Sequence, residues 1–246
     1  MDQVIPPASL KIKVAVCQQP LHEPLPTETL NELRSFAPDF ISLPEHYPLP
    51  KEVQDIHQAA SLFSKRKQYL QSLSVELSTV LVGGTLTELT YEGFYNTCYV
   101  FDCGQEVGFY RKVYPTQRER EAGVLRGSEF KMFEIRGTRV GVLICADVLF
   151  EESFHELSAL RCEIAFVPTA SPYRADESVE EKFGRDQSIF VEGSRKLDCP
   201  VIKTCGVGTT FGHPIQGRSL IATPKGILTR AEPHQESHPL ILFASL

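Results

Sequence analysis

The sequence predicts an α/β domain in which helices cover β-sheets, and three observations support this prediction. The length of 246 residues and the hydrophobic content of 42% suit one large globular domain, so we expect residues 1–246 to form a single domain. Strand and helix patterns alternate at both ends of the chain. Hairpin patterns predominate in between, which indicates sheets that helices cover rather than a helical bundle.

Strands and helices alternate in the first third of the chain. Thr27 follows Pro26 and is the expected N-cap of the first helix. The helical spacing before the third strand contains one expected break. In chain order, the predicted elements are a strand at residues 11–17, a helix at 27–36, a strand at 39–43, helical spacing over 51–78 and a strand at 80–83.

Two β-hairpins are predicted in the middle section. The first covers residues 94–112 with its turn at 102–104 (Asp-Cys-Gly), and the second covers 131–145 with its turn at 136–138 (Arg-Gly-Thr). The final strand of the second hairpin, RVGVLIC, ends on Cys145. Its apolar character predicts a buried strand whose last residue, the cysteine, lies at the edge of a sheet.

The last part of the chain returns to alternating patterns. The glycine-rich segment 206–212 is predicted to be a turn, because Pro214 follows, no helix opens and the dinucleotide-binding pattern therefore fails. The remaining predicted elements are a helix at residues 151–161, a strand at 164–167, a helix near 178–197 and strands at 201–204, 217–222, 227–230 and 240–243.

Charge and cysteine content exclude several classes of protein. The net charge is −6 and no block of Lys or Arg stands out, which argues against a nucleic-acid or anionic-membrane surface. The chain shows no apolar signal core and no run of membrane-spanning length. The seven cysteines are irregularly spaced, so we expect reduced thiols and a cytoplasmic protein. His234 and His238 lack a matched cysteine pair, and no metal site is expected.

Three residues that can carry chemistry each follow a predicted strand. Cys145 ends the strand RVGVLIC, Glu45 follows the strand at 39–43, and Lys112 ends the first hairpin. A strand-end cysteine needs a base and a positive charge to react as a thiolate, and a glutamate and a lysine supply them. Each residue alone is better explained as a buried thiol or a solvated charge; the three together favour a catalytic site.

The segments around these residues resemble the signature segments of the nitrilase superfamily of carbon–nitrogen hydrolases. The matching segments are LPEHY, YRKVYPTQRE and GVLICADVLFEE, in that order. Flanking segments such as AVCQQ, VGGTL, EIAFVPTASP and GRSLIATPKGIL extend the resemblance over nearly the whole chain. The resemblance implies a four-layer α-β-β-α sandwich and an enzyme of the amidase-like branch.

The resemblance also implies residue roles. Glu45 is expected to be the general base, Cys145 the nucleophile and Lys112 the residue that stabilises the tetrahedral intermediate. A second glutamate often joins this set, and Glu119 is the first choice, with Glu121 as the competitor. The reaction so implied is a two-step acyl transfer through a thioester, without metal or organic cofactor.

Three further residues are candidates for binding substrate. The backbone N–H of Ala146 is placed to face a developing oxyanion. Tyr173 and Arg174 fall in a loop that is expected to overhang the pocket, where an arginine can hold a carboxylate; an ordinary surface arginine is the competing interpretation. The family usually has an aromatic residue at the position of Ala146 and an arginine at that of Leu149, so the pocket is expected to be atypical.

The expected function is hydrolysis of a small-molecule amide, ω-amide or carbamoyl C–N bond. Acyl or amide transfer on the same scaffold is one alternative, because only the exclusion of water separates the two. A catalytically idle binding protein is the other, and the atypical residues after Cys145 keep it open. The resemblance further implies a homodimer or a higher homo-oligomer.

Overall fold

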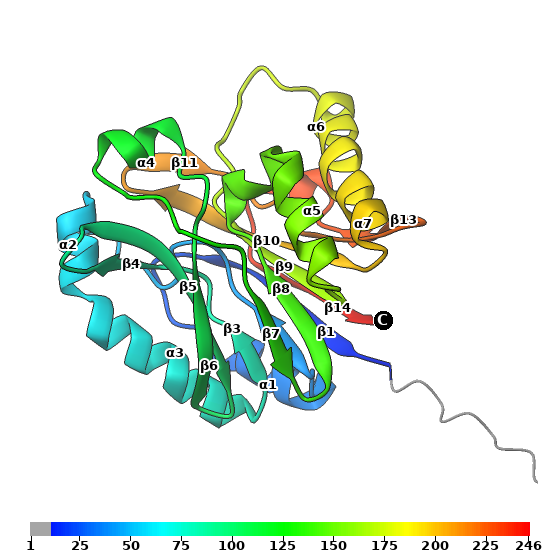
Figure 1. Ribbon diagram of the computed structural model, residues 1–246, viewed down its shortest axis with the longest axis horizontal. Helices are drawn as coiled ribbons and strands as arrows, with labels where there is room; N and C mark the ends of the chain where they lie inside the picture. The colour runs from blue at the N-terminus through cyan, green and yellow to red at the C-terminus, as the bar shows by residue number, and fades with distance from the viewer. Residues whose placement is uncertain (1–10) are drawn as a thin grey trace, which may run out of the picture.

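The computed structural model describes residues 11–246 and has four layers, helices–sheet–sheet–helices (Figure 1). One helical layer holds α1 (Thr27–Phe36), α2 (Ile56–Ser61) and α3 (Phe63–Leu77), and α4 (Gln117–Glu121) lies at the edge that carries the site. The opposite layer holds α5 (Glu151–Ala159), α6 (Val179–Asp186) and α7 (Glu192–Leu197). A π-helical segment, η2 (Gln187–Val191), joins α6 to α7, and 3-10 turns lie at η1 (Cys145–Leu149) and η3 (Pro233–Gln235). The predicted α-β-β-α sandwich is confirmed.

The strands form one continuous path that bends into two sheets. The path runs β4-β5-β3-β2-β1-β10-β9-β8-β7, with β6 on β5, β14 on β1, β11 and β12 on β10, and β13 on β12. The strands are β1 (Lys13–Pro20), β2 (Phe40–Ser42), β3 (Val80–Val82), β4 (Leu86–Leu89), β5 (Phe94–Asp102), β6 (Gln105–Arg111), β7 (Met132–Ile135), β8 (Thr138–Val142), β9 (Ile164–Thr169), β10 (Val201–Thr210), β11 (His213–Ile215), β12 (Leu220–Thr223), β13 (Gly226–Arg230) and β14 (Leu240–Ser245).

The bend lies where β1 meets β10. These two strands pair only at Gln19↔Gly206 and Pro20↔Val207, near the carboxyl end of β1. Over the residues that precede this joint the two strands diverge, and each is part of its own sheet. The parallel pairs β1–β2 and β8–β9–β10 therefore bring their carboxyl ends to one shared edge of the molecule, where sites of α/β proteins gather.

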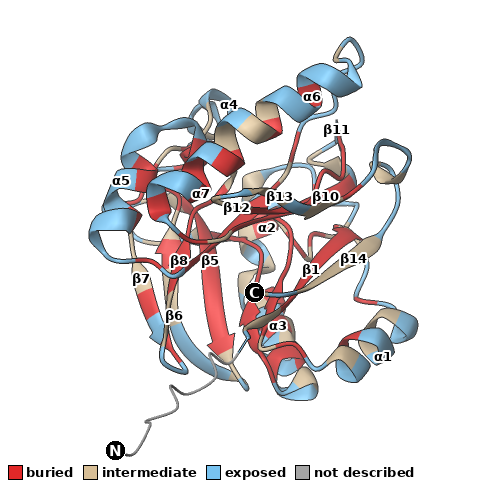
Figure 2. Cartoon of the chain, turned by 90° about the vertical axis from the view of Figure 1, so that its right-hand side faces the viewer, coloured by how far each residue is buried: buried red, intermediate tan, exposed pale blue. Residues whose placement is uncertain are grey.

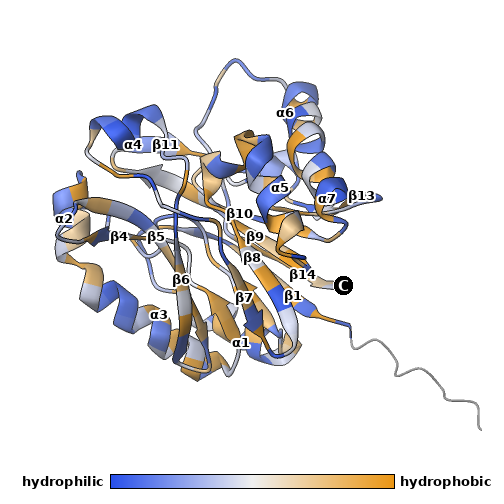
Figure 3. Ribbon diagram, viewed as in Figure 1, coloured by the Kyte–Doolittle hydropathy of each residue, from blue (hydrophilic) through white to orange (hydrophobic). Residues whose placement is uncertain are grey.

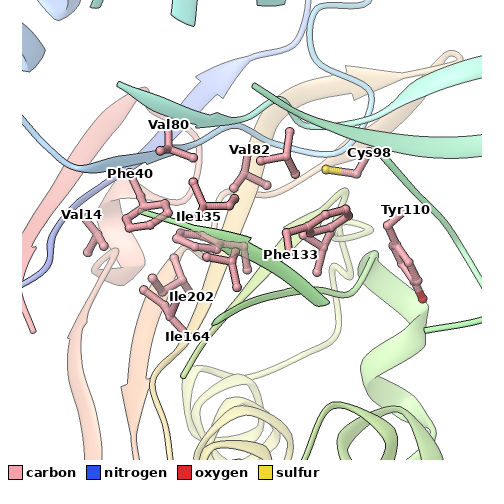
Figure 4. Close-up of a cluster of buried hydrophobic side chains, with 14 of the residues drawn as sticks. Val14, Phe40, Val80, Val82, Cys98, Tyr110, Phe133, Ile135, Ile164 and Ile202 are labelled. Carbon is pink, nitrogen blue, oxygen red and sulfur yellow. The ribbon is translucent and has the colours of Figure 1, made fainter. Parts of the chain in front are cut away.

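Alternation along the strands divides the apolar side chains between three cores. The core between the sheets joins residues such as Val82, Cys98 and Tyr110 of one sheet to Phe133 and Ile202 of the other (Figure 4). A second core packs the first sheet against α1 and α3, and a third packs the other sheet against α5 and α7. The central strands, such as β1, β9 and most of β5, are accordingly buried on both faces, while the outer helices stay exposed on one side (Figure 2).

Most predicted elements appear, with several corrections at their ends. Thr27 is the first helical residue of α1, whereas Pro26 occupies the N-cap without a side-chain bond. The strand expected to end on Cys145 stops at Val142, because Cys145 opens the 3-10 turn η1. The glycine-rich segment is mostly strand, since β10 runs to Thr210 and only the residues just after it turn. Strands β4 and β11 and helix α4 were not predicted.

Apolar residues concentrate in the strands, and polar residues concentrate on the outer helices (Figure 3). Among residues 11–246, every helix falls short of the length and apolar character that a membrane crossing requires.

Candidate active site

Segments that follow four strands converge at the shared edge of the sheets. Glu45 lies three residues after β2, Lys112 directly follows β6, and Cys145 follows β8. Ala170, the first residue after β9, joins them. Glu45 and Lys112 are almost fully buried and Cys145 is partly exposed. The structure thus brings together the three residues that the sequence singled out.

Glu45 accepts hydrogen bonds at both carboxylate oxygens. Its Oε1 accepts from Lys112 Nζ at 2.8 Å and from Asn96 Nδ2 at 2.9 Å. Its Oε2 accepts from the backbone N–H of Ala170 at 2.9 Å. Bonds from three donors to a buried carboxylate offset the cost of removing its charge from water.

Lys112 bridges two carboxylates. Its Nζ donates to Glu45 Oε1 and to Glu119 Oε2, each at 2.8 Å. Burial would lower the pKa of Lys112, but the charges of Glu45 and Glu119 raise its pKa well above the usual value. Burial would likewise raise the pKa of Glu119, and the ammonium of Lys112 together with hydrogen bonds lowers it to about 2. Lys112 is therefore a fixed positive charge, and Glu119 is ionised.

Glu119 and Glu121 lie in clearly different surroundings. Glu119 forms a capping box at the start of α4 with Thr116, and its Oε2 also accepts from Lys112. Glu121 is exposed and accepts a bond from Gln117. The geometry therefore selects Glu119 as the second glutamate of this cluster.

Cys145 sits in a strained turn beside the cluster. Its φ is 45°, in the left-handed region that residues with a side chain seldom occupy. Its Sγ lies 4.0 Å from the carbonyl oxygen of Ala170. Burial and then the charge of Glu45 raise the pKa of the Cys145 thiol well above its usual value, although Lys112 opposes them. The resting group is a thiol, and a base is required before it can attack.

Asp147 fixes the turn that holds Cys145. Its carboxylate accepts bonds from the backbone N–H groups of Ile144 and Tyr114, at 2.8 and 2.7 Å, and from the Tyr110 hydroxyl at 2.8 Å. Burial raises the pKa of Asp147 to about 6 in spite of these donors. Because Tyr110 and Tyr114 flank Lys112 in sequence, the same carboxylate sets the position of Lys112 relative to Cys145.

Ala146 is buried and directly follows Cys145, and its role as an oxyanion donor stays a prediction. In the part of the chain that the structure describes, no acceptor is bonded to the Ala146 N–H. The third N–H of Lys112 is likewise without an acceptor among those residues, since its Nζ is bonded only to the two glutamates. Two donors next to Cys145 therefore remain available.

Tyr173 and Arg174 are not joined to this cluster. Both are exposed in the loop that follows Ala170, and the Tyr173 N–H donates to the carbonyl of Pro214 at 3.1 Å. Within residues 11–246, no hydrogen bond or ion pair involves the side chain of Arg174. The loop does start at the site, through Ala170, so a role of either residue in binding stays a prediction.

Sequence reasoning missed Asn96, Ala170 and His46 as neighbours of Glu45. Asn96 was hidden inside the predicted strand, although a polar amide within the apolar run FYNTCYV was the available signal. His46 has its Nε2 4.0 Å from Glu45 Oε1, and its ring packs edge-on against Phe211. Burial lowers the pKa of His46 below 6.5, so its imidazole is neutral at pH 7.

The arrangement suits nucleophilic acyl chemistry. A thiol, a carboxylate close enough to raise the pKa of that thiol, a fixed ammonium and a backbone N–H without an acceptor among the described residues lie at one sheet edge. No group of three or more His, Cys, Asp or Glu side chains within residues 11–246 is placed to hold a metal ion.

Known proteins share both the sequence pattern and the fold. The chain is 29% identical to an N-carbamoylputrescine amidase from Solanum tuberosum over 205 residues, which cover 75% of this chain and 68% of that one. It is also 29% identical over 207 residues to a glutamine-dependent NAD(+) synthetase from Acinetobacter baylyi; these cover 81% of this chain but only 36% of the synthetase. The structure resembles that of an amidase from Nesterenkonia sp. AN1, with a TM-score of 0.77, 18% identity and coverage of 97% and 92% of the two chains.

A sequence model of one family covers almost the entire chain. The carbon-nitrogen hydrolase model matches residues 13–244, a range that contains Glu45, Lys112, Glu119 and Cys145. The chain therefore belongs to the carbon-nitrogen hydrolase family and has the fold of the nitrilase superfamily.

Proposed function

We propose that this protein hydrolyses a non-peptide C–N bond of a small molecule, an amide, ω-amide or carbamoyl group, through a thioester on Cys145. The observation that carries the proposal is the buried cluster of Glu45, Lys112 and Glu119 beside the strained turn of Cys145. Amidases among the relatives and structural neighbours support the substrate class.

The first half of the proposed reaction forms the thioester. Glu45 takes the proton from Cys145 Sγ, and the sulfur electron pair attacks the carbonyl carbon. The negative charge that develops on the carbonyl oxygen is stabilised by the remaining N–H of Lys112 and by the N–H of Ala146. The C–N bond then breaks, and ammonia or an amine leaves with the proton that Glu45 returns.

The second half releases the acid. Glu45 takes a proton from a water molecule, and the hydroxide attacks the thioester carbon. The same two donors stabilise the second tetrahedral intermediate. The C–S bond breaks, the sulfur recovers a proton from Glu45, and the carboxylic acid leaves.

A reactive cysteine is supported by one structural neighbour. A Glu-to-Gln mutant of the Nesterenkonia amidase has been solved with the acetamide moiety of fluoroacetamide added covalently at its active site cysteine, which shows that this sulfur acts as a nucleophile in that protein. That cysteine belongs to a protein 18% identical to this one. We extend the chemistry to Cys145 as part of the proposal.

Intact-protein mass spectrometry tests the proposal. Wild type and the variants Cys145→Ala, Glu45→Gln and Cys103→Ala are incubated with short amides, carbamoyl amino acids and nitriles. We expect an acyl adduct on wild type and on Cys103→Ala, whose exposed thiol lies in the β5–β6 turn away from the site. We expect none on Cys145→Ala. In Glu45→Gln, adduct formation should be slower by at least about 100-fold, the low end of what general-base catalysis contributes.

The products separate hydrolysis from transfer. A hydrolase releases the free acid in water alone, whereas a transferase releases product only when hydroxylamine or another amine acceptor is added. If the panel yields no adduct and iodoacetamide does not label Cys145 ahead of the other six cysteines, the nucleophile proposal is wrong and the protein is a binding protein on this scaffold.

A further inference from the structure

The two oxygens of Glu45 differ in the number of donors that they face. Oε1 accepts from both Asn96 Nδ2 and Lys112 Nζ, whereas Oε2 accepts only from Ala170 N–H. A carboxylate oxygen has about two lone-pair sites, so Oε1 is fully occupied and Oε2 keeps one site open. The carbonyl of Ala170, the residue bonded to Oε2, is also the group that faces Cys145 Sγ at 4.0 Å. The open site is therefore on the oxygen that is anchored next to the nucleophile.

The orientation of Asn96 is fixed by its partners. Its Nδ2 donates to Glu45 Oε1 at 2.9 Å and to Glu119 Oε1 at 2.8 Å. Both partners are carboxylates, which only accept when ionised, so the amide nitrogen and not its oxygen must face them. The consequence is that Asn96 Oδ1 is buried without a hydrogen-bond partner among the described residues. Asn96 is therefore paired through its amide nitrogen alone, and both of its N–H groups are directed at carboxylates of the site.

We infer that Asn96 is a positioning residue that directs proton transfer to one atom of the base. Asn96 and Lys112 together fill Oε1 of Glu45, so that the proton of Cys145 passes from Sγ to Oε2 and the electron pair stays on sulfur. By donating its second N–H to Glu119, Asn96 also fixes the carboxylate that holds Lys112. The inference rests on the proposed function of Glu45 and Cys145 and adds the atom and the residue that control the transfer.

Two variants of Asn96 test the inference, with a neighbouring residue as control. Asn96→Ala removes both N–H donors, and Asn96→Asp keeps the shape but replaces the donor with a third acidic group. Thr97→Val is the matched control, because Thr97 is equally buried on β5 and its hydroxyl donates to Glu88 at 2.9 Å, outside the site. The probe is iodoacetamide, and the rate of Cys145 alkylation is followed from pH 4 to 9 by peptide mass spectrometry. This measurement does not require the natural substrate.

We expect both Asn96 variants to shift the pH profile. A carboxylate that loses an N–H donor, or gains an acidic neighbour, holds a proton more tightly, so the acidic limb of the alkylation profile should move to higher pH by about one unit, which slows labelling about tenfold on that limb. Thr97→Val should keep the wild-type profile even if its melting temperature falls. A purely structural role of Asn96 would lower the melting temperature and leave the profile in place.

The outcomes distinguish this inference from the function on which it rests. If wild-type Cys145 is labelled preferentially but Asn96→Ala and Asn96→Asp retain the wild-type profile, the inference about Asn96 is overturned and the proposed nucleophile stands. If wild-type Cys145 is not labelled ahead of the other cysteines, the proposed function falls, and the inference falls with it. Should Asn96→Ala fail to fold, the near-isosteric Asn96→Asp decides alone.

Discussion

The carboxylate of Glu119 accepts hydrogen bonds from four donors, of which the ion pair with Lys112 is only one. Asn96 donates to its Oε1, while Lys112 and both the N–H and the hydroxyl of Thr116 donate to its Oε2. The same side chain thus closes the first turn of α4 and anchors Lys112 in the site. Because the pKa of Glu119 is lowered from 4.5 to about 2, ionised Glu119 stabilises the folded state.

The Glu119→Gln substitution should remove this stabilisation in a pH-dependent way. The contribution of an acid with a lowered pKa is complete above its unfolded pKa of 4.5 and is lost as the pH falls toward 2. We expect Glu119→Gln to be less stable by about 2–3 kcal/mol at pH 7, with a difference that narrows below pH 4.5. Urea unfolding at several pH values measures it. Glu121→Gln, on the exposed side of the same helix, is the control; an equal loss in both variants would contradict the prediction.

The site residues that the sequence revealed are those at strand ends. Glu45, Lys112 and Cys145 could be found because each follows an apolar run and the order of the three resembles a known family. Asn96 could not be found in that way, since its importance depends on which strand lies opposite the turn of Glu45. Such a contact is fixed by strand order, which periodicity along a chain does not contain.

The turn that carries Glu45 packs directly on the segment after β3. Gly84 has φ 63°, and a Cβ at this position would lie 2.2 Å from the carbonyl oxygen of Pro44. Next to it, Thr85 accepts a bond from the His46 N–H at 2.9 Å, and buried Arg66 donates to the carbonyls of His46 and Thr85. The position of Glu45 therefore depends on a glycine outside its own segment.

Gly84→Ala should damage the site more than an equivalent change elsewhere. Gly137→Ala is the control, because Gly137 also has positive φ (77°) but has no atom within 4 Å of the added Cβ. The control should lose only about 1 kcal/mol for its left-handed backbone. Gly84→Ala should lower the free energy of unfolding by at least about 2 kcal/mol more than the control, because the added Cβ collides with Pro44. Iodoacetamide should also label Cys145 more slowly in this variant. Thermal unfolding and iodoacetamide labelling measure the two effects; equal losses in both variants would argue against close packing of Gly84 on Pro44.

Helices and strands were predicted well where the hydrophobic periodicity extends over many residues. They were predicted poorly where tertiary contacts determine the secondary structure. The β5–β6 hairpin was predicted with its turn. The glycine-rich segment was misjudged because it pairs with β1 at Gly206 and Val207 and with β11 from Gly208 to Thr210, and the local sequence does not reveal these partners. Helix α4 has a signal that can be read from the sequence, the capping box between Thr116 and Glu119. The helix was still missed because it is only five residues long.

At the scale of the whole molecule, the alternation of strand and helix patterns predicted that helices cover sheets. It did not predict the strand order that connects the two sheets. Four layers follow from the family resemblance, whereas the path from β4 to β7 through the β1–β10 joint is visible only in the structure. That joint positions the candidate site, because it brings the carboxyl ends of β2 and β8 to the same edge. Glu45 and Cys145 meet there although 100 residues of sequence numbering separate them.

The oligomeric state is a prediction that belongs to this scale. We expect a homodimer or a higher oligomer, as the family resemblance implies, and large apolar side chains such as Leu149 and Phe150 are exposed just after Cys145. Light scattering coupled to gel filtration should give at least twice the chain mass of 27.6 kDa. A mass of one chain that persists as the protein concentration is raised would contradict it.

Strand β1 is the earliest strand of the described chain, and its neighbours are spread over the whole sequence. It pairs with β2 on one side and with β14, residues Leu240–Ser245, on the other, and its end meets β10. During synthesis, the ribosome must therefore release the chain as far as β14 before β1 can fill both of its edges. An apolar strand with an open edge persists on the nascent chain until then, and such intermediates aggregate. Chaperone dependence during translation, rather than low final stability, is the expected weakness of this protein in heterologous expression.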